Sequence, residues 1–136
     1  MNRNVSYALV AVVFATSLLS CARRRALLTA TPNVPGATGV VQIRDDPNGN
    51  VQYELRVQHL AKPGNLTPPA NTYVVWLRAP GSEAQNQGQL QVGDDLEGRF
   101  VSTTPSRNFE LFVTAENSPT VDSPSGMVVL RTNVQS

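Results

Sequence analysis

Cysteine and histidine are nearly absent from this sequence of 136 residues, which contains one of each, and aromatic residues make up only 6%. A single cysteine, Cys21, excludes an internal disulfide bond and a paired-thiolate metal site. A single histidine, His59, would have to serve any catalytic triad, and no serine lies in a Gly-x-Ser-x-Gly motif. We therefore expect no enzyme activity, no catalytic residues, no metal and no cofactor.

Charge is also scarce, since only 15% of the residues are charged. From Thr31 onward the sequence has seven basic and ten acidic residues, a net charge of −3. We see no basic stripe in the sequence of this mildly acidic region, so we expect no nucleic-acid partner.

The N-terminal region contains the longest apolar segment of the chain. Arg3 is followed by the mostly apolar residues Val5 to Leu19, which match the core of a signal peptide and are shorter than the ~20 residues that span a bilayer. The next residues complete the motif Leu18-Leu19-Ser20-Cys21, which resembles the lipobox of bacterial lipoproteins. The resemblance implies that residues 1–20 are a cleaved signal peptide and that lipidation of Cys21 anchors the protein to membrane lipid.

Two alternatives stay open for this region: an uncleaved transmembrane anchor with an unmodified Cys21, or an ordinary signal peptide cleaved near Cys21. The three arginines at 23–25 argue against export by the positive-inside rule. The same arginines would suit anionic headgroups after anchoring. We expect a membrane-anchored lipoprotein of the bacterial cell envelope that faces the periplasm or the exterior.

The segment that follows Cys21 has no sustained hydrophobic period. Residues 26–37, ALLTATPNVPGA, contain two prolines, one glycine and several small residues. We interpret residues 21–37 as the lipidated cysteine and a flexible tether, and we place the folded domain at residues 38–136.

Within this domain, the sequence is typical of strands and turns. Val51–Gln58 alternates apolar and polar residues without interruption, as expected of a half-buried strand. Asn48-Gly49 before it is a strong hairpin signal. The sequence therefore predicts an all-β, immunoglobulin-like antiparallel β-sandwich of about seven strands, at Val40–Arg44, Val51–Gln58, Thr72–Ala79, Gln89–Gly93, Leu96–Ser102, Phe109–Ala115 and Met127–Thr132.

Three polar motifs have structural interpretations. Because His59 ends the alternating strand, we expect a partly buried or strand-end histidine. The Asp46-x-Asn48-x-Asn50 motif lacks the glycine and glutamate of a calcium loop and is interpreted as a hairpin. The acidic residues after Gly93, namely Asp94, Asp95 and Glu97, are interpreted as a solvated turn.

The segment Tyr73-Val74-Val75-Trp76-Leu77, followed by Gln87-Gly88-Gln89-Leu90, resembles the extracytoplasmic C-terminal domain of anti-sigma-K factors. Phe109–Glu116 and Ser123–Leu130 are similar to the closing strands of that domain, where the family has a glutamate and a Pro-Thr-Gly motif. The resemblance implies a regulatory or sensing domain. It does not extend to holding a sigma factor, because the sequence lacks the cytoplasmic zinc-binding module of that family.

Alternation along the strands separates two faces. Tyr73, Val75 and Leu77 should share the inter-sheet core with Phe109, Leu111 and Val113 and should face Tyr53, Leu55 and Val57 across the sandwich.

Trp76 should pack beside Phe112 on the opposite face. We expect Trp76 and Phe112 to form an aromatic patch on the outside of one sheet, covered either by a partner or by the two proline-rich loops. These loops contain Pro68, Pro69, Pro119 and Pro124. We name the patch as a candidate partner surface.

Three functions remain open for such a domain, which we expect to be monomeric. It could be a non-enzymatic binding or regulatory module with an envelope protein partner. It could be the envelope component of an anti-sigma system with a separately encoded partner, or a structural lipoprotein without a discrete ligand.

Overall fold

The computed structural model describes residues 23–136; the expected signal peptide and Cys21 lie outside these residues. A short 3-10 helix, η1, covers Pro63–Asn65, and the strands are β1 (Arg24–Ala30), β2 (Thr38–Asp45), β3 (Val51–Gln58), β4 (Thr72–Arg78), β5 (Gln85–Leu90), β6 (Gly98–Thr104), β7 (Phe109–Glu116) and β8 (Val128–Val134).

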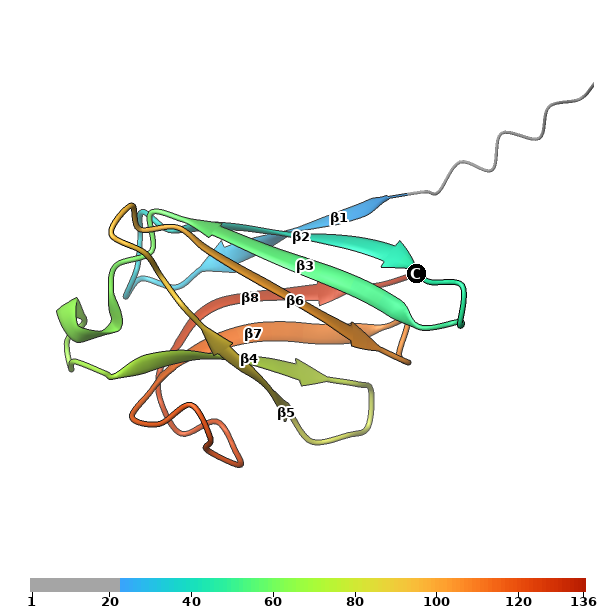
Figure 1. Ribbon diagram of the computed structural model, residues 1–136. Coiled ribbons are helices and arrows are strands. Elements are labelled where there is room, and N and C mark those ends of the chain that lie inside the picture. The colour runs from blue at the N-terminus through green and yellow to red at the C-terminus, as the bar shows by residue number, and fades with distance from the viewer. Residues whose placement is uncertain (1–22) are drawn as a thin grey trace, which may run out of the picture.

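These eight strands are all antiparallel and follow the order β5-β4-β7-β8-β1-β2-β3-β6. The sheet folds into two facing layers, β1-β2-β3-β6 and β8-β7-β4-β5 (Figure 1). Strand β1 joins them, because residues 24–28 pair with β2 whereas Thr29 and Ala30 pair with β8. An isolated bridge between Val92 and Gly98 brings the two outer strands β5 and β6 close together. The predicted all-β sandwich is confirmed, with eight strands instead of seven and a nearly closed, barrel-like form.

The flexible tether expected at residues 21–37 is wrong for residues 24–37. Arg24–Ala30 is a strand whose residue Leu28 pairs with Gly39 and is buried, and the following Val34 and Ala37 are buried as well. The pattern was hard to recognise because the neighbouring Leu27 points outward and is 78% exposed. The folded domain therefore begins at Arg24.

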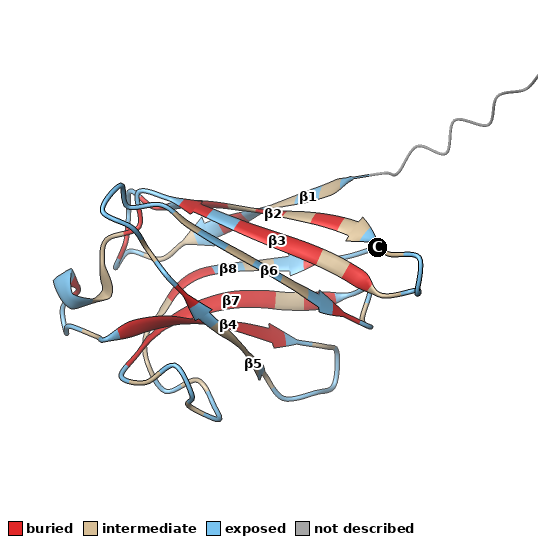
Figure 2. Ribbon diagram, viewed as in Figure 1, coloured by how far each residue is buried: buried red, intermediate tan, exposed pale blue. Residues whose placement is uncertain are grey.

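The core between the two layers is the one that alternation predicts. Tyr53, Leu55 and Val57 from β3 belong to one buried cluster with Tyr73, Val75 and Leu77 from β4 and with Phe109, Leu111 and Val113 from β7. Figure 2 shows these strands buried along most of their length. The predicted assignment of faces in β4 and β7 is therefore confirmed.

Candidate functional site

Trp76 and Phe112 face away from the inter-sheet core, as predicted. They are paired across β4 and β7, and their rings are stacked with centroids 6.4 Å apart and an interplanar angle of 17°. With Val74 they form a second hydrophobic cluster, separate from the main core. The prediction that the two aromatic side chains are neighbours is confirmed.

The prediction that these two residues form an exposed partner surface is wrong. Trp76 is completely buried and Phe112 is only 2% exposed. Ala84, Val121 and Val128 pack against them. Val121 belongs to residues 117–127, which connect β7 to β8 and lie on the outside of their layer (Figure 1). We call this segment the cover loop.

The cover loop is fixed at one end by the buried carboxylate of Glu116. Its oxygens accept hydrogen bonds from the Ser125 backbone N–H at 3.0 Å, the Ser125 hydroxyl at 2.7 Å and the Gly126 N–H at 3.0 and 3.1 Å. Thr114 donates another at 2.6 Å and accepts one from Trp76 Nε1 at 2.7 Å. One hydrogen-bond network thus joins the tryptophan, the carboxylate and the cover loop.

Two further features hold this arrangement in place. Burial would raise the pKa of Glu116, but the hydrogen bonds from Thr114, Ser125 and Gly126 outweigh it and lower the pKa below its usual value. At Gly126 a Cβ atom would lie 1.6 Å from the carbonyl oxygen of Ala115, so only glycine fits there. These contacts give a structural role to the glutamate and to the Ser125-Gly126 pair. The resemblance drew attention to the glutamate and to the Ser125-Gly126 pair, but the sequence did not show that their contacts hold a loop over Trp76.

The opposite layer has an open outer face. It carries Arg25 on β1, Arg44 on β2, Arg56 on β3 and Arg99 on β6, and Glu54 is the only outward-facing acidic residue within these four strands. Glu97, directly before β6, lines a concavity with Arg56 and Arg99. We call this surface the basic face; its apolar members are Leu27, Val40 and Val101. One row of paired residues across the four strands is Leu27, Val40, Arg56 and Arg99, and the next is Arg25, Gln42, Glu54 and Val101.

Glu54 organises part of the basic face. Arg99 donates hydrogen bonds to its two carboxylate oxygens at 3.0 and 3.2 Å, and Arg56 donates another. These donors lower the pKa of Glu54 from its usual value to about 2. Within residues 23–136, Arg25 and Arg44 form no ion pair.

The apolar residues of the basic face lie beside these charges. Leu27, at 78% exposure, is the most exposed large hydrophobic residue that the structure describes, and Val101 is 39% exposed. A groove of about 260 Å³ runs beside Leu27, Val40 and Arg56. The combination of arginines and a protruding leucine can bind a surface that is both anionic and partly apolar.

The sequence did not reveal this face. Successive arginines of this face are separated by between 12 and 43 positions in the chain, so they form no continuous basic segment of the sequence. The expectation that the domain has no basic stripe is therefore wrong, since antiparallel pairing brings the four side chains to one surface.

The other polar motifs have the structural roles expected of them. Asp46 caps the β2–β3 hairpin by accepting hydrogen bonds from the N–H groups of Asn48 and Asn50 at 2.7 and 3.1 Å. The acidic turn at residues 94–97 is exposed. His59, expected to be either partly buried or at the end of a strand, directly follows β3 and is exposed, because its backbone turns to a φ of +56° and Leu60 is the next residue to enter the core.

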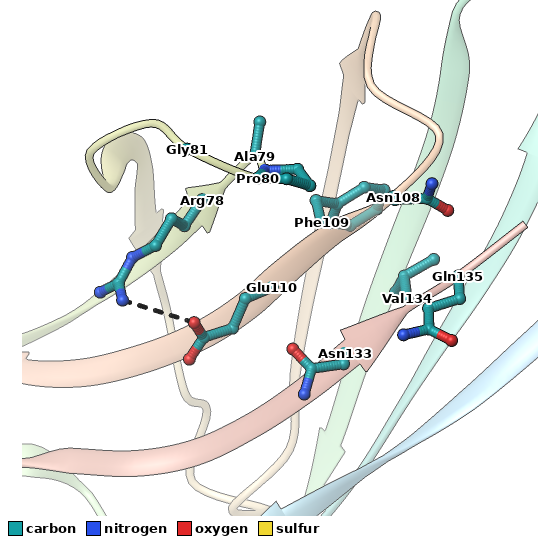
Figure 3. A pocket seen from close by; sticks show the side chains of 10 residues that line it. All are labelled: Arg78, Ala79, Pro80, Gly81, Asn108, Phe109, Glu110, Asn133, Val134 and Gln135. Carbon is teal, nitrogen blue, oxygen red and sulfur yellow. Dashed lines mark ion pairs between the residues drawn. The ribbon is translucent and has the colours of Figure 1, made fainter.

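A second concavity lies at one end of the sandwich, where Figure 3 shows Arg78 and Glu110 facing each other. Its volume is about 250 Å³, and its ion pair has an N–O distance of 3.6 Å. The remaining lining includes Pro80, Phe109 and the amide side chain of Asn133. No nucleophile lies beside a general base in this lining.

In the part of the chain from residue 23 onward, no group of three or more potential metal ligands occurs. In the same part, no helix has the length and apolar character needed to cross a bilayer. Known protein-family models give no match to the chain, and no curated protein sequence matches it.

Proposed function

We propose that this protein is a lipid-anchored β-sandwich of the bacterial envelope, and that it acts as a non-enzymatic binding or regulatory module. The observation that carries this proposal is the short distance between the lipobox-like cysteine and the folded domain. Only Ala22 and Arg23 separate Cys21 from the first residue of β1. Since an extended chain spans at most ~3.6 Å per residue, the Cα atom of Arg24 lies within about 11 Å of that of Cys21.

Because the connection is this short, lipidation of Cys21 would determine where the folded domain lies. A diacylglyceryl group on the thiol and a further acyl chain on the new amino terminus would each contribute ~0.8 kcal/mol per buried CH₂ group. Such anchoring would hold the domain directly at the membrane surface, without the tether that we expected from the sequence. A module in this position meets membrane lipids and neighbouring envelope proteins.

The mass of the N-terminal peptide tests the anchor. The full chain is expressed in a bacterial host, extracted from membranes with detergent, and analysed by intact and peptide mass spectrometry. We expect cleavage before Cys21 and the added mass of acyl chains on that residue. The Cys21→Ser variant should retain residues 1–20. An unmodified thiol in the membrane-extracted protein would overturn the proposal and favour one of the two alternatives for the N-terminus.

An anti-sigma system with a separately encoded partner is the second candidate function. The contacts of Glu116 with Ser125 and Gly126 support it, because they involve the same positions that resemble the closing motif of anti-sigma-K domains. Affinity purification of the intact lipoprotein from its own membranes tests this candidate. A stoichiometric membrane partner with a cytoplasmic sigma-binding module would support it. A partner without such a module would favour the general binding module, and the absence of any stoichiometric partner would favour a structural lipoprotein.

A further inference from the structure

The basic face contrasts with the charge of the rest of the domain. Four arginines and one glutamate give it a net charge of +3, whereas the other residues of the domain from Arg24 onward include five basic and nine acidic residues, a net charge of −4. Of the other nine acidic residues of the chain, Asp45 ends β2 and Glu97 lies beside Arg56 and Arg99 just before β6, whereas the remaining seven lie in turns, in loops and on the opposite layer. Pairing of the strands has therefore concentrated positive charge on one surface of an otherwise acidic domain.

This surface lies next to the expected anchor. Arg25 is four residues after Cys21, and both Arg25 and Leu27 are outward-facing residues of β1. The positive charge continues from β1 across β2 and β3 to β6, and adjacent strands are only ~4.8 Å apart. An anchor at Cys21 therefore places one edge of the basic face at the headgroups, and the remaining strands extend from that edge.

We propose that the basic face docks on the anionic lipid headgroups of the membrane that holds Cys21; this inference rests on the proposed lipid anchor. Arg25 and Arg44 would contact phosphate groups, and Leu27 would enter the interface between headgroups and acyl chains. Arg56 and Arg99 keep Glu54 neutralised, so that its carboxylate does not oppose the contact. The domain then lies on the membrane with the layer of β4 and β7 facing away from the bilayer.

Lipid fits this surface better than an acidic protein for two reasons. The chain length between Cys21 and β1 already brings the face to the membrane, so docking requires no additional partner. The exposed leucine also lies among the arginines, as in membrane surfaces that combine apolar insertion with electrostatic attraction.

Fluorescence quenching on vesicles tests this orientation. The acylated full chain with Leu27→Cys is labelled at the new thiol with an environment-sensitive dye, since an acylated Cys21 has no free thiol. It is reconstituted into phosphatidylcholine vesicles, with and without phosphatidylglycerol, that contain a nitroxide-labelled lipid. Ser82→Cys, in the exposed β4–β5 loop, is the matched labelling control.

We expect quenching at position 27 in vesicles with phosphatidylglycerol and much less in phosphatidylcholine alone, with no such difference at position 82. The double variant Arg25→Gln/Arg44→Gln should lower the ratio of docked to undocked protein about 25-fold, at about fivefold per arginine. The variant Arg107→Gln/Arg131→Gln, which removes the same charge outside the basic face, should leave the ratio nearly unchanged.

Equal quenching at positions 27 and 82, or an equal effect of the two double variants, would overturn the docking proposal while the anchor stands. Protection of position 27 in native membranes but not in protein-free anionic vesicles would overturn it in favour of an acidic protein partner. Dye attached to Cys21 would show that the thiol is free, and the anchor and the docking proposal would then both fail.

Discussion

The outer faces of the two layers of the sandwich differ in their exposure to solvent. The outer face of β4 and β7 contains Trp76 and Phe112, yet it is buried. The outer face of β1, β2, β3 and β6 contains Leu27, yet it is open to solvent. Alternation shows which residues share a face, but it does not show whether another segment covers that face.

The connections between strands explain the difference. The β7–β8 connection, residues 117–127, is long enough to fold back over its own layer, and Glu116 fixes its end. By contrast, the β2–β3 connection is a tight turn at residues 46–50 that leaves no chain to cover the neighbouring face. The two faces can be compared directly by substituting matched residues on each.

Trp76→Ala should have the largest effect on stability. It removes the largest fully buried side chain and also the hydrogen bond to Thr114, so we expect a loss of about 3–5 kcal/mol in the free energy of unfolding. Urea denaturation followed by circular dichroism measures this loss. Val101→Ala, on the open face, is the control and should change stability by less than about 1 kcal/mol. Equal losses in both variants would show that the two faces do not differ in burial.

Glu116→Gln should destabilise the cover loop by about 1–3 kcal/mol, because the amide replaces a carboxylate that accepts hydrogen bonds from three backbone and hydroxyl donors of the loop. Glu110→Gln is the matched control. Glu110 is more exposed and lies 3.6 Å from Arg78 and 4.0 Å from Arg131, so its loss should cost at most about 1 kcal/mol.

Hydrogen exchange distinguishes this local effect from a global one. The amides of the cover loop and of Trp76 should exchange faster in Glu116→Gln, whereas those of β2 and β3 should change much less. Uniform acceleration across all strands would contradict a role for Glu116 as the local clamp of the cover loop.

Low pH should destabilise the contacts of both Glu54 and Glu116, whereas high salt should change the pKa of Glu54 much more than that of Glu116. Because the folded-state pKa of Glu54 is lowered to about 2, its stabilising contribution is complete above the unfolded-state value of 4.5 and is lost as the pH falls from there toward 2. The sign is the same for Glu116, whose pKa is also lowered. The partners of Glu54 are half-exposed arginines, whereas those of Glu116 are neutral donors.

We therefore expect the pKa of Glu54 to rise toward its ordinary value when salt increases from about 0.01 M to about 1 M, because screening weakens its ion pairs. The pKa of Glu116 should change much less. Titration of the side-chain carboxyl carbons by NMR measures both values in one sample. A larger salt effect at Glu116 than at Glu54 would contradict the assignment of charged partners to Glu54 and neutral partners to Glu116.

These features also show how far the sequence can be interpreted. The strands at Val51–Gln58 and Thr72–Arg78, the hairpin between β2 and β3 and the division of Trp76 from the main core were predictable, since they depend on local alternation and turn residues. Cover of Trp76 by a proline-rich loop was one of two alternatives that the sequence left open, but the contacts that hold this loop in place and the basic face were not predictable. They depend on contacts between residues far apart in the chain, such as Val121 with the Trp76 cluster and Arg99 with Glu54.

Strand β1 was missed for a different reason. Prolines at 32 and 35 follow it closely, and the adjacent leucines 27 and 28 hide its alternation, so the segment resembles a linker. Pairing with β2 and β8 overrides this local signal, because Leu28 can enter the core while Leu27 remains outside.

The smallest expected effect is that of Leu27→Ala, and it gives the most direct test of β1. If β1 is a strand, two adjacent leucines must respond differently, since successive side chains point to opposite faces. Leu27→Ala should change the free energy of unfolding by no more than about 0.5 kcal/mol, because the side chain is 78% exposed. Leu28→Ala should cost about 2–5 kcal/mol, because this side chain is buried against Gly39. In a flexible tether neither substitution would matter, and in a segment buried on both sides both would. A large difference between the two variants in chemical denaturation would therefore establish β1 as a strand with one open face, and similar values would contradict it.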